Sequence, residues 1–300
     1  MTFEKQKSNR KSGISLVLLS GIFWSTSGII YRLIDEASAW QVLFYRSLAL
    51  FILMITWLII KYRINIFKII TNSIKLHLIG GFLLGTAFTG YIQALEHTSV
   101  ANAMFILAIA PFITALLGIV ILREKILVYM WICMIFTAIG LTIMVVDEIS
   151  LGRGLGEFSA MIAALGFSGM TIAIRANNKN NLLPTILFAS FFAMVFSVVM
   201  IIYKGDYFSL KNIDLIYSCG MGVLQLGLGA VLYTAGARYL IAVELTLLSL
   251  TEVIVGPILV WLIIDESPTK MGLLGGLIIL ISIVVMAIFG FKSEKNIKLL

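Results

Sequence analysis

The sequence contains an internal repeat, and this repeat constrains the fold more than any single motif does. Residues 241–268 resemble residues 100–125 at an offset of 142 positions, and each copy holds a long apolar run that ends in a charged turn. At offsets of 142 or 143, the residues that also coincide are Trp24 with Phe167, Ser25 with Ser168, Arg32 with Arg175, and Tyr91 with Tyr233. The chain is therefore predicted to be a duplicated half of about 140 residues.

Long apolar runs recur through both halves of the sequence. A bilayer core about 30 Å thick requires roughly 20 apolar residues in a helix, and this chain is 60% hydrophobic and only 12% charged. These properties predict an all-α polytopic membrane protein with ten transmembrane helices. The predicted helices cover residues 13–33, 39–60, 76–95, 99–122, 127–146, 154–175, 182–203, 215–236, 242–264 and 269–291.

Each half contains five crossings, an odd number, so the second half must enter the membrane from the opposite side. The predicted organisation is an N-terminal tail (1–12), a first repeat (13–146), a second repeat (154–291) and a C-terminal tail (292–300). With both tails in the cytoplasm, 16 of the 22 Lys and Arg residues lie on the inner side, in agreement with the positive-inside rule. We therefore predict two inverted five-helix repeats with both termini in the cytoplasm.

Charge and composition also exclude several function classes. The net charge of +7 is explained by the topology and gives no reason to expect nucleic acid as a partner. The short loops hold no Gly-rich phosphate motif, so we expect no nucleotide-hydrolysing domain. His77 and His97 do not form a metal-binding pattern with Cys, Asp or Glu, and Cys133 and Cys219 fall within predicted helices. We expect no cofactor, no metal site and no enzymatic activity.

Glu252 is the strongest candidate for a functional residue. It lies near the centre of the predicted helix 242–264, where a carboxylate costs roughly 2.5 to 3.5 kcal/mol to insert. One interpretation is that Glu252 faces a water-filled cavity and binds a cationic substrate group or a proton. The other is that a neutral, hydrogen-bonded Glu252 holds helices together. The depth of the residue favours the first interpretation.

Two more charged residues lie within predicted helices. Arg46 is the eighth residue of the helix 39–60, at a depth that can match that of Glu252. It is expected to pair with Glu252, to bind a substrate carboxylate, or to extend toward the interface. Glu244 points about 80° away from Glu252 around the same helix, so it is interpreted as a helix cap, an interfacial residue or a gate.

Aromatic and amide side chains supply further cavity candidates. Trp24 and Phe167 occupy equivalent mid-helix positions of the two halves, where they either stack on a substrate or pack against other helices. The remaining candidates are Tyr91, Gln225 and Tyr233.

Proline and glycine mark expected irregularities and contacts. Pro111 and Pro257 are predicted to break the helices of the two copies near mid-span, as hinges or as kinks needed for packing. Small residues at helical spacing predict close approach between helices. The glycines with this spacing include Gly81 and Gly85, Gly222 and Gly229, and Gly272 and Gly276.

Four segments together resemble the EamA family of the drug/metabolite transporter superfamily. They are GIFWSTSG around Trp24, FYRSLAL around Arg46, APFITALLGIVILREK from Ala110, and LLSLTEVIVGPILVWLIIDES around Glu252. The resemblance implies a bacterial inner-membrane secondary transporter with alternating access and a cavity lined by the first four helices of each half. It also implies that Glu252 is the glutamate of the family's usual Glu-Pro pair, although Val253 follows it here and the proline is displaced to Pro257.

The repeat, the buried acid and the interrupted helices together favour a secondary transporter. We expect it to move a small polar or zwitterionic organic metabolite, such as an amino acid or an amine, with proton coupling through Glu252 as one mechanism. The alternatives are a passive channel or facilitator, which would need a row of like groups along a pore, and a membrane scaffold or lipid-modifying enzyme. The expected partners are the substrate, the lipid bilayer and protons, and the expected assembly is a monomer or homodimer.

Overall fold

The computed structural model describes residues 3–98, 100–145, 154–176, 182–264 and 270–292, and within these ranges it is helical, with no strand. Seven of its helices are long and apolar enough to cross a membrane. Shorter apolar helices occupy residues 110–122, 128–143 and 273–289, at the other three positions where the sequence predicts a span. The predicted turn at 265–267 and the C-terminal tail after residue 292 lie outside the described residues.

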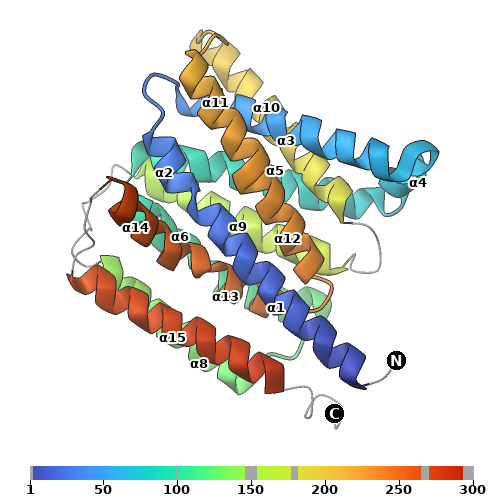
Figure 1. Ribbon diagram of the computed structural model, residues 1–300, viewed down its shortest axis with the longest axis vertical. Coiled ribbons are helices and arrows are strands. Elements are labelled where there is room, and N and C mark those ends of the chain that lie inside the picture. The colour runs from blue at the N-terminus through green and yellow to red at the C-terminus, as the bar shows by residue number, and fades with distance from the viewer. Residues whose placement is uncertain (1–2, 99, 146–153, 177–181, 265–269, 293–300) are drawn as a thin grey trace.

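The helices of the two halves follow the same order along the chain (Figure 1). The first half contains α1 (Phe3–Ser25), α2 (Ser27–Arg32), α3 (Ala39–Tyr62), η1 (Arg63–Asn65), α4 (Ile66–Thr71), α5 (Ile74–His97), α6 (Val100–Leu107), α7 (Ala110–Leu117), the π-helix η2 (Gly118–Leu122) and α8 (Val128–Val145). The second contains α9 (Leu155–Ala176), α10 (Leu183–Lys204), α11 (Asn212–Gly220), the π-helix η3 (Met221–Leu228), α12 (Gly229–Gly236), α13 (Ala242–Ser249), α14 (Thr251–Ile264) and α15 (Lys270–Lys292).

The packing of the helices repeats when the two halves are exchanged. α1 packs on α12, and their equivalents α9 and α5 also pack on each other. In the same way, α1 packs on α14, and α9 packs on the equivalent helices α6 and α7. α3 packs on its own equivalent α10, and α8 packs on its equivalent α15 along one side of the molecule (Figure 1). Two halves related by a two-fold axis have this pattern of contacts. The equivalent helices of the two halves are therefore arranged around a common axis.

Equivalent helices run in opposite directions. α1 is parallel to α14, whereas α9 is parallel to α7, and α7 in turn lies antiparallel to α13 and α14. α1 and α9 are therefore antiparallel, and Figure 1 shows them beginning at opposite ends of the bundle. The two halves thus have the inverted arrangement that the odd number of predicted crossings requires.

The first helix begins earlier than the sequence predicts. α1 starts at Phe3 rather than at residue 13, because the Lys, Glu, Gln and Arg residues of the expected tail are good helix formers. The predicted loop between residues 61 and 75 is also partly helical, since it contains η1 and α4.

Within the described residues, three of the predicted crossings are interrupted. α1 ends and α2 begins at Thr26, α6 and α7 are separated at residues 108–109, and α13 and α14 are separated at Leu250. The second and third breaks occupy equivalent places, because Ala108 and Leu250 coincide at the repeat offset of 142. Pro111 lies in the first turn of α7, close to its break.

The break in the second copy does not lie at Pro257, so its predicted position was wrong. Pro257 is inside α14, and the chain breaks seven residues earlier, at Leu250. Hydroxyl groups on either side of this break bond back to the preceding turn: Ser249 donates to the Thr246 carbonyl at 2.9 Å, and Thr251 donates to the Leu248 carbonyl at 2.8 Å. Such bonds weaken and bend helices. They give a physical cause for the break at Leu250, whereas Pro257 lies too far along α14 to cause it.

Several glycines lie where helices approach most closely. A Cβ added at Gly90 of α5 would lie 2.5 Å from the Ser159 carbonyl, and one added at Gly166 of α9 would lie 2.5 Å from the Leu83 carbonyl. An added Cβ at Gly222 would overlap the Arg46 carbonyl. At Gly276, by contrast, an added Cβ would have no described atom within 4 Å, so the helical spacing of glycines alone did not identify the contacts.

Candidate functional site

A cavity of about 70 Å³ lies between the two halves. Because a buried water needs roughly 10–15 Å³ of such volume, the cavity has room for several waters in this conformation. Its lining comes from both halves and consists of Trp24, Arg46, Leu84, Ala87, Phe88, Tyr91, Leu107, Ala163, Phe167, Gln225, Leu226 and Glu252. Six of the eight side chains that the sequence analysis selected as binding candidates are among them; the exceptions are Tyr233 and Glu244.

Glu252 contributes a carboxylate to this lining. The break at Leu250 places it in the first turn of α14, where the N-terminal end of the helix dipole favours negative charge. Among the residues that the structure describes, none forms a hydrogen bond or an ion pair with its carboxylate. The half-helix thus offsets part of the cost of placing a half-buried carboxylate inside the bundle, while leaving its oxygens available to a ligand.

Arg46 of α3 contributes a guanidinium and is fully buried. Its Nη2 donates to the Phe88 carbonyl at 3.3 Å, and its guanidinium carbon lies 5.5 Å from the centre of the Phe88 ring. Its Nε and Nη1 atoms have no partner in the described part of the chain. No ion pair between Arg46 and Glu252 occurs there either, so the cavity presents two separate, oppositely charged groups.

Three aromatic rings meet beside the two charges. The Trp24 ring centre lies 5.6 Å from that of Phe167 and 5.2 Å from that of Tyr233, and the Phe167 and Tyr233 centres are 5.4 Å apart. Trp24 fits against η3 and α12 because a Cβ added at Gly229 would overlap its indole. The buried Trp24 Nε1 has no partner among the described residues.

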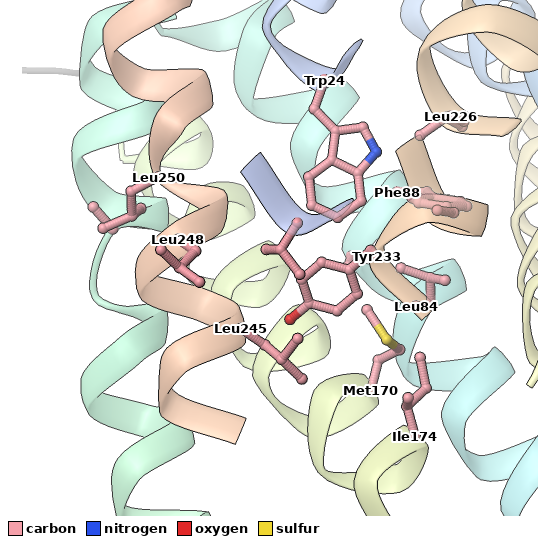
Figure 2. Close-up of a cluster of buried hydrophobic side chains, with 14 of the residues drawn as sticks. Trp24, Leu84, Phe88, Met170, Ile174, Leu226, Tyr233, Leu245, Leu248 and Leu250 are labelled. Carbon is pink, nitrogen blue, oxygen red and sulfur yellow. The ribbon is translucent and has the colours of Figure 1, made fainter. Parts of the chain in front are cut away.

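Tyr233 does not line the cavity itself. Figure 2 shows its ring below that of Trp24, with Met170 and Ile174 beneath it and Leu248 and Leu250 on one side. Its hydroxyl forms a hydrogen bond of 2.8 Å with Thr171. Tyr233 therefore supports Trp24 and packs within a cluster of apolar side chains on that side of the indole.

Two polar side chains complete the lining. The Tyr91 hydroxyl forms a hydrogen bond of 2.8 Å with Ser27 in the first turn of α2, just beyond the break at Thr26. Gln225 lies in η3, and its Oε1 is buried without a partner within the described part of the chain. A π-helix in a long helix often marks a functional site, and here it brings an unsatisfied amide to the cavity.

The sequence analysis missed Phe88 and Ser27. Phe88 precedes Tyr91 by three residues, so both lie on one face of α5, and this spacing was a usable signal. Ser27 gave no such signal, because its role depends on the break at Thr26, which no proline marks.

Glu244 lies away from the cavity. It forms an ion pair with Arg10 of α1, accepts a hydrogen bond from the Ile241 backbone N–H at 3.3 Å, and accepts another from Tyr129 at 3.4 Å. These contacts match the helix-cap interpretation. They also tie the start of α13 to α1 and α8.

Glu124 closes the same end of the bundle across both halves. Arg175 of α9 donates to Glu124 Oε1 at 3.1 and 2.8 Å, and to the Ala237 carbonyl at 3.1 Å. The Ala242 N–H at the start of α13 donates to Glu124 Oε2 at 2.9 Å. This charge-assisted network joins α7, α9, α12 and α13, so it must rearrange if the cavity is to open at this end.

Asp214 of α11 organises the opposite end. Its carboxylate accepts the backbone N–H groups of Asp35, Glu36 and Ala37, each at 3.2 Å. Lys211 bonds to Glu36, and this hydrogen bond raises the pKa of the lysine. The loop between α2 and α3 is thereby held against the second half.

Two segments of the chain, residues 11–146 and 154–288, match the model of the EamA-like transporter family. The chain belongs to this family. It is therefore an integral membrane protein of a transporter family, and its two matched segments are the two halves whose packing repeats in the structure.

A relative of this EamA-like protein and a solved structure extend the comparison. The relative, named "Uncharacterized transporter sll1164", comes from Synechocystis sp. (strain ATCC 27184 / PCC 6803 / Kazusa) and is 26% identical over 222 residues. The match covers 68% of this chain and 62% of the relative, so this chain spans less than two thirds of the relative's length. A chain in a solved crystal structure has the same fold, with a TM-score of 0.75, 14% identity, and coverage of 94% of this chain and 99% of that chain.

Proposed function

We propose that this EamA-like protein is a secondary transporter that moves a small polar or zwitterionic organic metabolite across the inner membrane by alternating access. In this proposal the seven long and three shorter apolar helices form ten crossings, with both termini in the cytoplasm. The observation that carries the proposal is the cavity between two oppositely oriented halves, lined by the carboxylate of Glu252 and the guanidinium of Arg46.

The two charges suit a ligand that carries both an amine and a carboxylate. A substrate ammonium would pair with Glu252 and a substrate carboxylate with Arg46, whose partner-less Nε and Nη1 supply two donors. The apolar part of the substrate would contact Trp24, Phe167 and Phe88. Since the cavity holds only about 70 Å³ in this conformation, binding requires the halves to separate.

The inverted halves and the contacts at the two ends support alternating access. The Glu124–Arg175 network closes the end where the positive-inside rule places the cytoplasm. Opening to that side requires those bonds to break. The interrupted helices supply places where half-helices can tilt without disturbing the rest of the bundle.

A thermal-shift screen tests the proposal. Purified protein is mixed with amino acids, quaternary amines, nucleosides and organic acids, and Glu252→Gln is measured in parallel. A ligand present at one hundred times its dissociation constant stabilises the native state by about 2.7 kcal/mol, so a substrate should raise the melting temperature. We expect a zwitterion to do so in the native protein and not in Glu252→Gln. Equal shifts in both proteins would remove Glu252 from the binding site.

Proton coupling through Glu252 is a further part of the proposal. If Glu252 exchanges a proton for the substrate, uptake into proteoliposomes should respond to an imposed pH gradient. Glu252→Gln, which cannot ionise, should abolish that response. Transport that is equally pH-dependent in the variant would assign the coupling to another group.

A further inference from the structure

A second pocket lies between the ends of α3 and α12, apart from the central cavity, and no described residue lines both. Its volume is about 280 Å³, close to the lower limit of roughly 300 Å³ for small-molecule pockets. Leu16 of α1 and the residues Leu182 and Leu183 at the start of α10 also line it, so an occupant would contact both halves.

The polar part of this pocket is basic. Lys61, from the last turn of α3, and Arg238, two residues after the end of α12, both line it, and among the described residues no carboxylate does. The Lys61 ammonium lies 5.4 Å from the centre of the Tyr62 ring, and within the described part of the chain it has no acidic partner. Charge complementarity therefore favours an anionic occupant.

An apolar groove continues from the basic pocket along α3. The two share Trp57 and Lys61, and the groove adds Leu53, Thr56 and Ile60. Its volume is about 490 Å³. Ile60 is 72% exposed and Trp57 is 40% exposed, so this face of α3 is turned outward from the bundle, where a membrane helix meets lipid.

The position of the pocket agrees with the membrane interface. It lies where α3 and α12 end, and Trp57, Tyr62 and Tyr239 surround its cations. Aromatic residues concentrate at the headgroup level of a bilayer, and the excess of Lys and Arg assigns this end to the cytoplasmic side. The inner leaflet is also the anionic one.

We propose that the pocket and groove together bind an anionic phospholipid. The phosphate diester lies between Lys61 and Arg238, and an acyl chain follows the groove past Trp57, Thr56 and Leu53. A soluble anion would contact the two cations but would leave the groove unused. The joint presence of a basic pocket and a continuous apolar groove therefore selects the lipid.

Lipid titration of the purified, delipidated protein tests this site. Binding of phosphatidylglycerol and of phosphatidylethanolamine with the same acyl chains is measured by native mass spectrometry. We expect the anionic lipid to bind more tightly, and each of Lys61→Gln and Arg238→Gln to weaken its binding about fivefold, the effect of one basic residue at an anionic surface. Lys68→Gln, an exposed lysine on α4 outside the pocket, is the matched control and should leave binding unchanged.

Two further experiments distinguish a lipid site from a site for a small anion. Thr56→Trp fills the groove while keeping both cations, so it should weaken phosphatidylglycerol binding, and inorganic phosphate should not displace the lipid. Displacement by millimolar phosphate, or full lipid binding by Thr56→Trp, would overturn the proposal in favour of a small-anion site. Equal affinity for the two lipids, or an unchanged affinity in Lys61→Gln, would overturn it as well.

Discussion

Substitution of Gly222 by alanine should separate α3 from η3 beside the cavity. The added Cβ would overlap the Arg46 carbonyl oxygen and would lie 3.0 Å from the Ala49 Cβ. The main obstacle is a backbone atom, which cannot rotate away as the end of a flexible side chain can. Relief therefore requires a shift of one helix against the other, at the point where Arg46 enters the cavity.

The magnitude follows from a comparison with Gly220, two residues earlier. A Cβ at Gly220 would have no atom of the described residues within 4 Å. Both substitutions gain helix propensity, up to about 1 kcal/mol, so their difference isolates the steric contact. Overpacking a core typically costs about 1–3 kcal/mol, and Gly222→Ala should be less stable than Gly220→Ala by this amount.

Thermal unfolding of the two purified variants in the same detergent measures this difference. If each kcal/mol changes the melting temperature by roughly 2–4 °C, Gly222→Ala should melt several degrees below Gly220→Ala. It should also bind any ligand of the native protein more weakly, because Arg46 is displaced. A melting temperature equal to or above that of Gly220→Ala would refute the close approach of α3 and η3.

Three further substitutions test other parts of the structure. Asp214→Ala leaves three backbone N–H groups without their acceptor, so it should lower the free energy of unfolding, measured by chemical denaturation, by about 1–3 kcal/mol. An unchanged free energy would contradict the role of this carboxylate in holding the loop between α2 and α3. Gly229→Ala should displace Trp24 and weaken ligand binding in a thermal-shift titration, and native affinity would show that the indole does not contact the ligand. Glu244→Gln should keep native ligand affinity, since Glu244 lies outside the cavity, whereas the Glu252→Gln variant should lose it; equal loss in both would place the site elsewhere.

The architecture was predictable because the hydrophobic pattern and the repeat act over long stretches of sequence. Two halves with inverted orientation follow from an odd number of apolar runs per half, and the family match and the repeated helix packing support the two-repeat architecture. The gathering of Trp24, Phe167, Arg46 and Glu252 was also accessible, because all four lie within predicted helices near mid-depth and inverted repeats form their binding sites near the midplane. Their individual roles in binding remain predictions.

The irregularities of the helices were not predictable in the same way. The break at Leu250 depends on hydroxyl groups that bond back to the helix, and Ser and Thr occur in many helices without breaking them. The π-helix around Gln225 likewise depends on how η3 packs against α3. Tertiary contacts determine where these breaks and π-helices form. Because of the break at Leu250, Glu252 lies in the first turn of a half-helix instead of in the middle of a continuous helix.

The most direct test of alternating access measures whether the cavity opens to each side in turn. In a background with Cys133 and Cys219 changed to serine, Ala87→Cys places a thiol on the cavity wall, and a membrane-impermeant maleimide is applied from either side of oriented vesicles. Adding Glu124→Gln weakens the Arg175 network that closes one end. The account predicts faster labelling from that side and slower labelling from the other, because opening one end requires closing the other. Labelling that rises from both sides, or that is confined to one side in both proteins, would contradict it.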